Sequence, residues 1–234
     1  MCLMKINKNP SRYRLWKEME SFAASIPKGS MVLDAGSGDA PYKSLFKHVY
    51  YQNTDFLKIN KMYEMPTFIC DLTNIPVKSN YYDINVFTQV IEHLSDPKQT
   101  LSELFRVLKP GGKMFLSGPF FFEEHEQPYD FYRFTQYGLR YLLNTAGFII
   151  ERIDWLEGYF GTVSYQLKIM AWNIPYNPRD FDLGFVGYIL VPFMMFIKVF
   201  FAFLSLLFTE LEIHKKYTHK GFPKNFVVVV RKPM

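Results

Sequence analysis

Three aspartates and a glycine-rich turn have the types and spacing to hold a small ligand that carries hydroxyl and amino groups. The segment DAGSG at 34–38 follows a short apolar run, and its glycines let the backbone turn tightly and approach a ligand. Asp55 lies where a second strand should end, a position that suits a carboxylate gripping ribose hydroxyls. Asp71 follows a third apolar segment, from which it could reach an adenine amino group.

A dinucleotide with a pyrophosphate fits this turn poorly. The fingerprint for such a ligand is G-x-G-x-x-G, and its last glycine would fall at position 41. That residue is Pro41, which has no backbone N–H to donate to a phosphate oxygen. The turn therefore favours a ligand without phosphate.

A second group of polar residues could act on a substrate. His125 lies in the segment 118–143, after a predicted fifth strand, and His93 follows the fourth. Imidazole titrates near neutral pH, so either histidine could take a proton from a hydroxyl nucleophile, or could instead fix a loop or cap a turn. Asp130 and Arg133 could bind an acidic or sugar substrate together with Tyr129, or could pair with each other to hold the loop.

The elements that must position these residues alternate between strand and helix. Such alternation predicts a parallel sheet with right-handed crossovers, whose carboxyl ends share one edge. Predicted strands occupy 31–33, 49–55, 67–71, 83–88, 113–117, a segment from 148, and 225–232. Predicted helices occupy 11–26, 97–108 and 135–146, and a further one could start in 43–48.

Several motifs in order carry a family resemblance over about Met31 to Gly147. They read VLDAGSG at 32–38, then Asp55, then CDLTNIPVKSNYYDI at 70–84, QVIEHLSDP at 89–97 and LFRVLKPGGKMFLSGP at 104–119. The chain resembles the class I S-adenosylmethionine-dependent methyltransferases, in particular those that act on small molecules. The resemblance implies a Rossmann-like α/β fold: a seven-stranded mixed sheet with helices on both faces, and here an apolar helical insertion before the last strand.

The resemblance also implies S-adenosylmethionine as the cofactor and assigns it residues. Asp34, Gly36 and Gly38 would surround its methionine moiety, and Asp55 would bind its ribose hydroxyls. Asp71 and Leu72 would hold its adenine, while Gln89 would line the site near the methionine end. The family's usual third glycine is Ala40 in this sequence, small enough to keep close packing.

The acceptor is harder to define. The segment H-x-x-P-Y-D-F-x-R-F-T from His125 resembles methyltransferase-like proteins of bacterial glycan and surface-polymer synthesis. We therefore expect methylation of a small-molecule, sugar or lipid-linked acceptor, at a hydroxyl oxygen. The alternative is a non-catalytic, methyltransferase-like module that associates with membranes. A nucleic-acid partner is not expected, because the net charge of +5 is mild and no N/D-P-P-Y motif follows the fourth strand. No metal is expected, since no residues stand in a ligand spacing.

Composition fits one domain with an unusual insertion. The chain has 234 residues, 49% hydrophobic and 21% charged, which excludes a disordered protein. We expect a single methyltransferase domain over 1–234, with a cofactor-binding core at 31–147, an insertion at 158–222 and a final strand at 225–232. The two cysteines, Cys2 and Cys70, are expected to be reduced thiols.

The insertion contains an apolar run, 183–208, whose one charge is Lys198. The final strand must return to the sheet, so a single membrane span would leave it on the wrong side. Three arrangements stay open: two interfacial helices split at Pro192, a re-entrant hairpin, or burial in the core or a homodimer. The basic cluster at 214–220 would suit anionic lipid head groups. We expect a cytoplasmic protein, peripheral on the inner face of the membrane.

Overall fold

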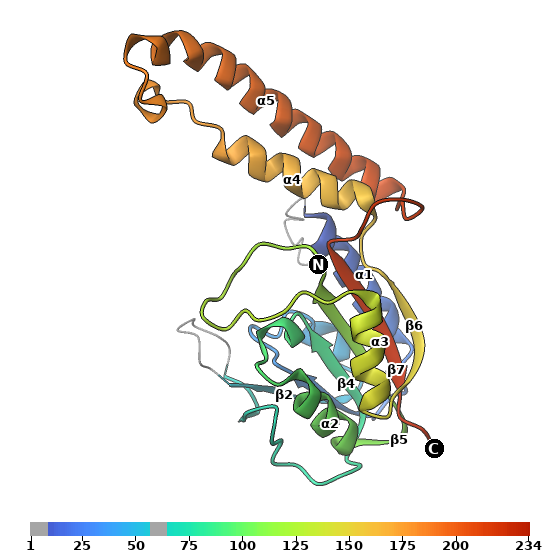
Figure 1. Ribbon diagram of the computed structural model, residues 1–234. Coiled ribbons are helices and arrows are strands. Elements are labelled where there is room, and N and C mark those ends of the chain that lie inside the picture. Colours follow the sequence, from blue (N-terminus) through green and yellow to red (C-terminus); the bar gives the residue numbers. More distant parts are fainter. Residues whose placement is uncertain (1–8, 57–64) are drawn as a thin grey trace. The chain divides into compact units, whose positions relative to one another are not determined.

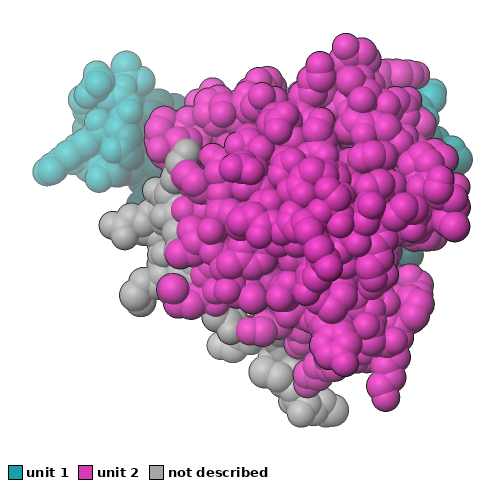
Figure 2. All heavy atoms as spheres, turned by 90° about the horizontal axis from the view of Figure 1, so that it is seen from below, with its two compact units in different colours: residues 1–14, 157–224 teal, residues 15–156, 225–234 magenta. Residues whose placement is uncertain are grey.

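The computed structural model describes residues 9–56 and 65–234, which form two compact units. The sheet unit contains Leu15–Leu156 and Asn225–Met234, and the hairpin unit contains Glu157–Lys224 with the described residues up to Arg14 (Figure 2). The second segment of the hairpin unit nearly matches the predicted insertion. The prediction of a single domain stays a prediction, and Cys2 lies outside the described residues.

The sheet unit is built on seven strands in the order β3-β2-β1-β4-β5-β7-β6 (Figure 1). Strands β1 to β5 pair in parallel, and β7 runs antiparallel to both β5 and β6. This is the predicted seven-stranded mixed sheet. The strands are β1 Met31–Ala35, β2 Tyr50–Asp55, β3 Phe68–Ile69, β4 Tyr82–Thr88, β5 Leu108–Pro119, β6 Ile149–Trp155 and β7 Asn225–Arg231.

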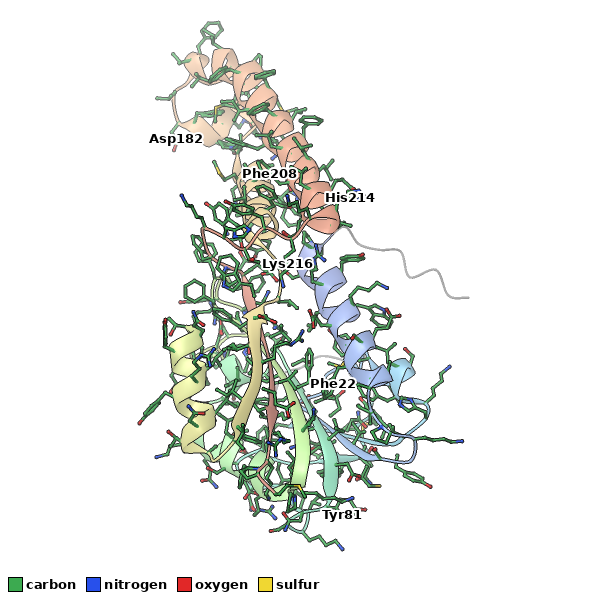
Figure 3. All side chains as sticks on the ribbon, turned by 90° about the vertical axis from the view of Figure 1, so that its right-hand side faces the viewer. Phe22, Tyr81, Asp182, Phe208, His214 and Lys216 are labelled. Carbon is green, nitrogen blue, oxygen red and sulfur yellow. The ribbon has the colours of Figure 1, made fainter. Side chains whose placement is uncertain are left out.

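Alternating side chains give the sheet a core on each face. Val32, Val86 and Phe115 point to the face covered by α1 (Pro10–Ala24), whereas Leu33 and Leu116 point to the opposite face. The second face is covered by α2 (Pro97–Val107) and α3 (Gln136–Thr145), so helices flank the sheet on both sides (Figure 3). Burial on both faces explains the continuous apolar runs of β1, β5 and β7, at 31–33, 114–116 and 226–230.

The connection after β1 differs from the sequence prediction. In place of an α-helix starting in 43–48, the chain makes a single 3₁₀ turn, Lys43–Phe46. Tyr50 already begins β2, so the short connection leaves no room for a longer helix. The glycine-rich turn is consequently not followed directly by an α-helix, and its backbone N–H groups donate to the end of β2 instead. A second 3₁₀ turn, Ile91–His93, follows β4.

The hairpin unit consists of α4 (Tyr159–Asn173) and α5 (Phe185–His214), which pack against each other. A 3₁₀ turn, Pro178–Phe181, lies in their connection; in Figure 3 Asp182 marks this turn and His214 the far end of α5. Of the three arrangements left open by the sequence, the structure excludes two helices split at Pro192, because α5 continues through this residue. A proline costs a helix one internal hydrogen bond, and the packing along α4 here outweighs that loss.

Candidate functional site

The predicted cofactor residues gather at the carboxyl edge of the parallel strands. Asp34 is the next-to-last residue of β1, and Asp55 is the last residue of β2. Asp71 follows β3, and Gln89 comes directly after β4. Because β1 lies between β2 and β4 at the point where the strand order reverses, these residues flank the crevice in which such sheets bind ligands.

The glycine-rich turn is tied to the end of β2 by backbone hydrogen bonds. Gly36 N and Ser37 N both donate to Thr54 O, at 2.8 and 3.1 Å. Gly38 N donates to Asp55 Oδ2 at 2.9 Å. Gly36 has φ +72°, and a Cβ there would lie 2.6 Å from Val90 Cγ2. Only glycine fits this position, so the turn shape is fixed by the sequence.

The Asp34 carboxylate is almost completely buried, with 2% of the residue exposed. It accepts a hydrogen bond from the Tyr51 hydroxyl at 2.5 Å. Burial raises the pKa of Asp34 to about 7; the Tyr51 hydrogen bond opposes this rise and the Asp55 charge adds to it. The carboxyl is therefore poised to ionise near neutral pH when a cationic group approaches.

The other predicted cofactor residues have local partners. Asp71 Oδ1 accepts from Thr73 N and Thr73 Oγ1, at 2.9 and 2.8 Å, while Leu72 packs in the core. Gln89 has φ +55°, and its Nε2 donates to Ser117 Oγ at 3.1 Å. A non-glycine residue held at positive φ is strained, a feature that clusters at functional sites. The individual roles of these residues toward the cofactor stay predictions.

The carboxylates at this edge fit S-adenosylmethionine. Asp34 and Asp55 interact electrostatically, and the charges of Asp55 and Asp71 both act on the buried Cys70 thiol, whose pKa is raised chiefly by burial. Carboxylates accept hydrogen bonds from ribose hydroxyls and amino groups and attract a sulfonium or ammonium cation. They would repel a pyrophosphate. The residues present therefore fit the group that the resemblance implies.

Both predicted catalytic histidines meet beside this edge. His93 ends the 3₁₀ turn after β4 and His125 lies in the loop after β5, with ring centroids 4.7 Å apart. His93 Nδ1 lies 2.6 Å from the carbonyl oxygen of Tyr129. Burial lowers the pKa of His93, which favours the neutral imidazole that a base requires.

The loop after β5 is held by the pair Asp130 and Arg133. Arg133 Nη1 and Nη2 donate to the two Asp130 oxygens, each at 2.7 Å, and its Nε donates to Phe122 O at 3.0 Å. The Arg133 hydrogen bonds hold the pKa of Asp130 down at about 2. Of the two interpretations open from the sequence, the structure shows the pairing. A substrate role for Tyr129, Asp130 and Arg133 stays a prediction.

Sequence reasoning missed Glu92, whose carboxylate lies within 4.8 Å of a ring nitrogen of each histidine. It is fully buried, and its backbone oxygen accepts from Phe131 N and Tyr132 N at 2.8 and 3.2 Å. Gly118 on β5 lies beside this segment, and a Cβ there would come within 2.8 Å of Ile91 Cγ2, whereas Glu92 Oε2 would be at an ordinary contact distance of 3.9 Å. In the sequence Glu92 reads as one more surface acid, and only the adjacent His93 could have drawn attention to it.

Comparison with known proteins supports this fold, and the matched segment contains the aspartates at the carboxyl edge. Residues 33–116, which contain β1 to most of β5, match the methyltransferase domain family. This match identifies residues 33–116 as a methyltransferase domain, and it agrees with the class I S-adenosylmethionine-dependent type that the sequence motifs resemble. The predicted recognition, fold class, enzyme class and cofactor are thereby confirmed for this domain.

The curated relatives of this methyltransferase domain differ in acceptor. One is a tRNA (carboxymethyluridine(34)-5-O)-methyltransferase from Arabidopsis thaliana, 31% identical over 109 residues, which are 44% of this chain and 27% of that protein. Another is a ubiquinone/menaquinone biosynthesis C-methyltransferase from Burkholderia cenocepacia, 29% identical over 71% of this chain and 68% of that one. The chain thus spans only about a quarter of the Arabidopsis protein.

Solved structures show the same fold at low identity. The cyclase SpnF has a TM-score of 0.56 at 16% identity, with 96% of this chain and 82% of that one covered. A phosphoethanolamine N-methyltransferase 2 from Haemonchus contortus, in complex with S-adenosylhomocysteine, has a TM-score of 0.55 at 15% identity, covering 95% and 53%. One fold therefore carries different reactions, and the reaction must be argued from the site.

Proposed function

We propose that this methyltransferase transfers a methyl group to a hydroxyl oxygen of a small-molecule, sugar or lipid-linked acceptor. The observation that carries the proposal is the position of His93 and His125 beside the carboxylate edge, after β4 and β5. S-adenosylmethionine supplies a methyl group activated on a sulfonium. The acceptor oxygen forms the new bond to that carbon, the carbon–sulfur bond breaks, and the sulfur keeps the electron pair.

In this proposal the chain aligns the reactants and removes one proton. Asp34 and Asp55 hold the cationic and hydroxyl-bearing parts of the cofactor, and the strained Gln89 closes that side of the site. A histidine of the pair accepts the acceptor's hydroxyl proton as the bond to carbon forms. Positioning two reactants at contact distance provides most of the acceleration in such a displacement, and a base contributes typically 10²–10⁴-fold.

An acceptor screen tests the proposal. Purified full-length protein in detergent-containing buffer is incubated with S-adenosylmethionine carrying a labelled methyl group and with sugars, lipid-linked sugars, quinone precursors or tRNA. A base-stable methyl ether on a sugar or lipid-linked sugar supports the proposal. Label transferred to a tRNA or to a quinone ring carbon would instead align this chain with its named relatives and refute the proposed acceptor. Binding of the cofactor without transfer to any class would favour the non-catalytic membrane module.

We also propose that the hairpin unit inserts into the membrane surface, which would place the enzyme on the inner face of the membrane. Helix α5 is long and apolar enough to cross a bilayer, with a mean hydropathy of 2.3 over its most apolar window, of which 6% is buried. Every exposed side chain from Leu183 to Leu211 is uncharged. Large residues dominate this face, among them Phe185, Tyr188, Phe193, Phe196 and Phe203.

Several polar groups of the hairpin lie between its two helices, although Lys168 and Asn173 of α4 are exposed. The Ser164 and Thr209 hydroxyls are 2.5 Å apart, and Ser205 Oγ donates to Ser164 O at 2.9 Å. Lys198 Nζ donates to the carbonyl oxygens of Trp172 and Ile174 at the end of α4, both at 3.2 Å. Interhelical polar contacts of this kind hold helices together in lipid, where apolar side chains gain nothing by pairing.

Chain connectivity favours a hairpin that enters and leaves on one side. Trp155 at the end of β6 pairs with Phe226 at the start of β7, so the insertion leaves and re-enters the sheet at one place. The basic cluster at 214–220 follows α5 directly, where it would meet anionic head groups. The alternatives are a second copy of the chain over the same face and burial in another protein.

Vesicle flotation tests the membrane proposal. The wild-type protein should float with vesicles that contain phosphatidylserine, and Phe196→Asp with Phe203→Asp should abolish flotation. Tyr137→Asp is the matched control, because Tyr137 on α3 of the sheet unit is equally exposed and aromatic. Equal flotation of the double variant would refute the proposal. A loss of dimers without a change in flotation would identify a second copy as the partner of this face.

A further inference from the structure

Within the part of the chain that the structure describes, the buried Glu92 carboxylate of this site has no hydrogen-bond partner. Its exposure is 0%, and neither Oε1 nor Oε2 has a hydrogen-bond partner among the residues that the structure describes. A buried carboxylate without a partner is expensive, and each such group in a folded protein calls for a bound proton, water or ion.

His93 presents a lone pair toward this carboxylate. A carbonyl oxygen can only accept, so the 2.6 Å contact with Tyr129 O places the proton on Nδ1 and leaves Nε2 unprotonated. His93 Nε2 lies 3.8 Å from Glu92 Oε1 and 3.9 Å from Glu126 Oε2. A backbone carbonyl that fixes the tautomer in this way is the usual outer partner of a metal-bound histidine.

His125 is oriented by the same logic. Its Nδ1 lies 3.2 Å from Glu123 O and 3.3 Å from Asp130 Oδ2, both acceptors. The proton therefore belongs on Nδ1 and the lone pair on Nε2. Asp130 also accepts from the backbone N of His125 at 2.8 Å, so the carboxylate that Arg133 holds also positions this imidazole.

One ligand atom from each of Glu92, His93 and His125 lies within 4.8 Å of the other two. Two imidazoles and one carboxylate are a ligand set that binds zinc and other divalent transition metals. Bonds of about 2.0–2.2 Å to a common ion need these atoms to approach by roughly 1 Å, which side-chain rotation can supply. No sequence spacing pointed to this set, because His125 joins the other two only through the loop after β5.

We propose that Glu92, His93 and His125 bind one divalent transition-metal ion, with zinc the first candidate. The ion compensates the buried carboxylate and uses the two lone pairs that the loop directs inward. Three protein ligands leave one position open. Resting on the proposed function, that position would take the acceptor's hydroxyl oxygen, whose proton a divalent ion makes easier to remove. Because both imidazole lone pairs would then be on the ion, this proton would pass to solvent water and not to a histidine.

Metal binding is tested on the full-length, chelator-treated protein, without a histidine tag and with neither cofactor nor acceptor present. We expect calorimetry to show one equivalent of Zn²⁺ per chain, and both Glu92→Gln and His125→Gln to weaken binding by at least ~10-fold, as the loss of a directly bonded ligand demands. His48→Gln is the matched control, because His48 contacts Ile26 O before β2, away from the carboxyl edge.

Folding is checked separately by thermal unfolding without metal. Glu92→Gln should unfold at the wild-type temperature or above, since Glu92 makes no side-chain hydrogen bond that the change could break. Adding Zn²⁺ should raise the unfolding temperature of wild type and of His48→Gln but not of the two ligand variants. Wild-type affinity in a folded Glu92→Gln would assign the zinc to surface histidines and overturn the proposal, as would a wild type that binds none. Because no methyl transfer is measured, this outcome is independent of the acceptor screen.

Discussion

Asp55→Asn is the sharpest test of how the domain holds its cofactor. Asp55 Oδ2 accepts from Gly38 N at 2.9 Å, so this carboxylate anchors the glycine-rich turn, and its other oxygen is the one predicted to accept from the ribose. An asparagine can keep its oxygen on Gly38 N and so preserve the turn. Its other atom is then an N–H donor, which cannot accept from a ribose hydroxyl.

The change removes the charged acceptor while the fold stays intact. A hydrogen bond to a charged group contributes about 1.5–3 kcal/mol, and we expect the affinity for S-adenosylmethionine to fall by roughly 10- to 150-fold. Calorimetry at pH 8 measures it, above the Asp34 pKa of about 7, so that Asp34 is ionised in every protein compared. Asp55→Ala should lose at least as much, because it also releases Gly38.

The control removes the same charge elsewhere. Asp154 lies on β6, at the opposite edge of the sheet from β3, and its side chain is 52% exposed. Asp154→Asn should bind the cofactor with wild-type affinity. If Asp55→Asn keeps its unfolding temperature and binds within twofold of wild type, the ribose assignment is refuted.

Three further predictions concern the same unit. As the pH rises toward 7, cofactor affinity should increase by up to about tenfold per pH unit, and above pH 7 it should level off, because a cationic ligand favours ionised Asp34. Calorimetry measures this dependence, which Asp34→Asn should lack. Gly36→Ala should lower the free energy of unfolding in urea by about 2–4 kcal/mol, from positive φ and the contact with Val90, and Val90→Ala should restore part of it. Because the Asp130 pKa is lowered to about 2, ionised Asp130 stabilises the fold by about 2 kcal/mol above pH 4. This stabilisation should fade as the pH falls toward 2. Urea unfolding between pH 2 and pH 4 measures it, and Arg133→Gln should lack it.

The sequence determined the positions of most strands and one edge of the site. Motifs around Asp34, Asp55 and Asp71 sit at strand ends, and parallel strands bring their carboxyl ends to one edge whatever the details of packing. Gly36 fixed the turn, because no other residue fits its backbone conformation against Val90. These features depend on residues that are close together in the sequence, so the sequence alone is enough to predict them.

Tertiary structure decided what lay between distant segments. The helix expected after the glycine-rich turn is one 3₁₀ turn, since β2 starts too soon, and Pro192 does not break α5, whose packing along α4 compensates for the missing bond. Glu92 became a candidate ligand only when the structure showed that it is buried and close to both His93 and His125, which lie on separate segments of the sequence. Only the structure shows which side of α5 is polar, because Ser205 and Thr209 mark that side by their contacts with Ser164 of α4.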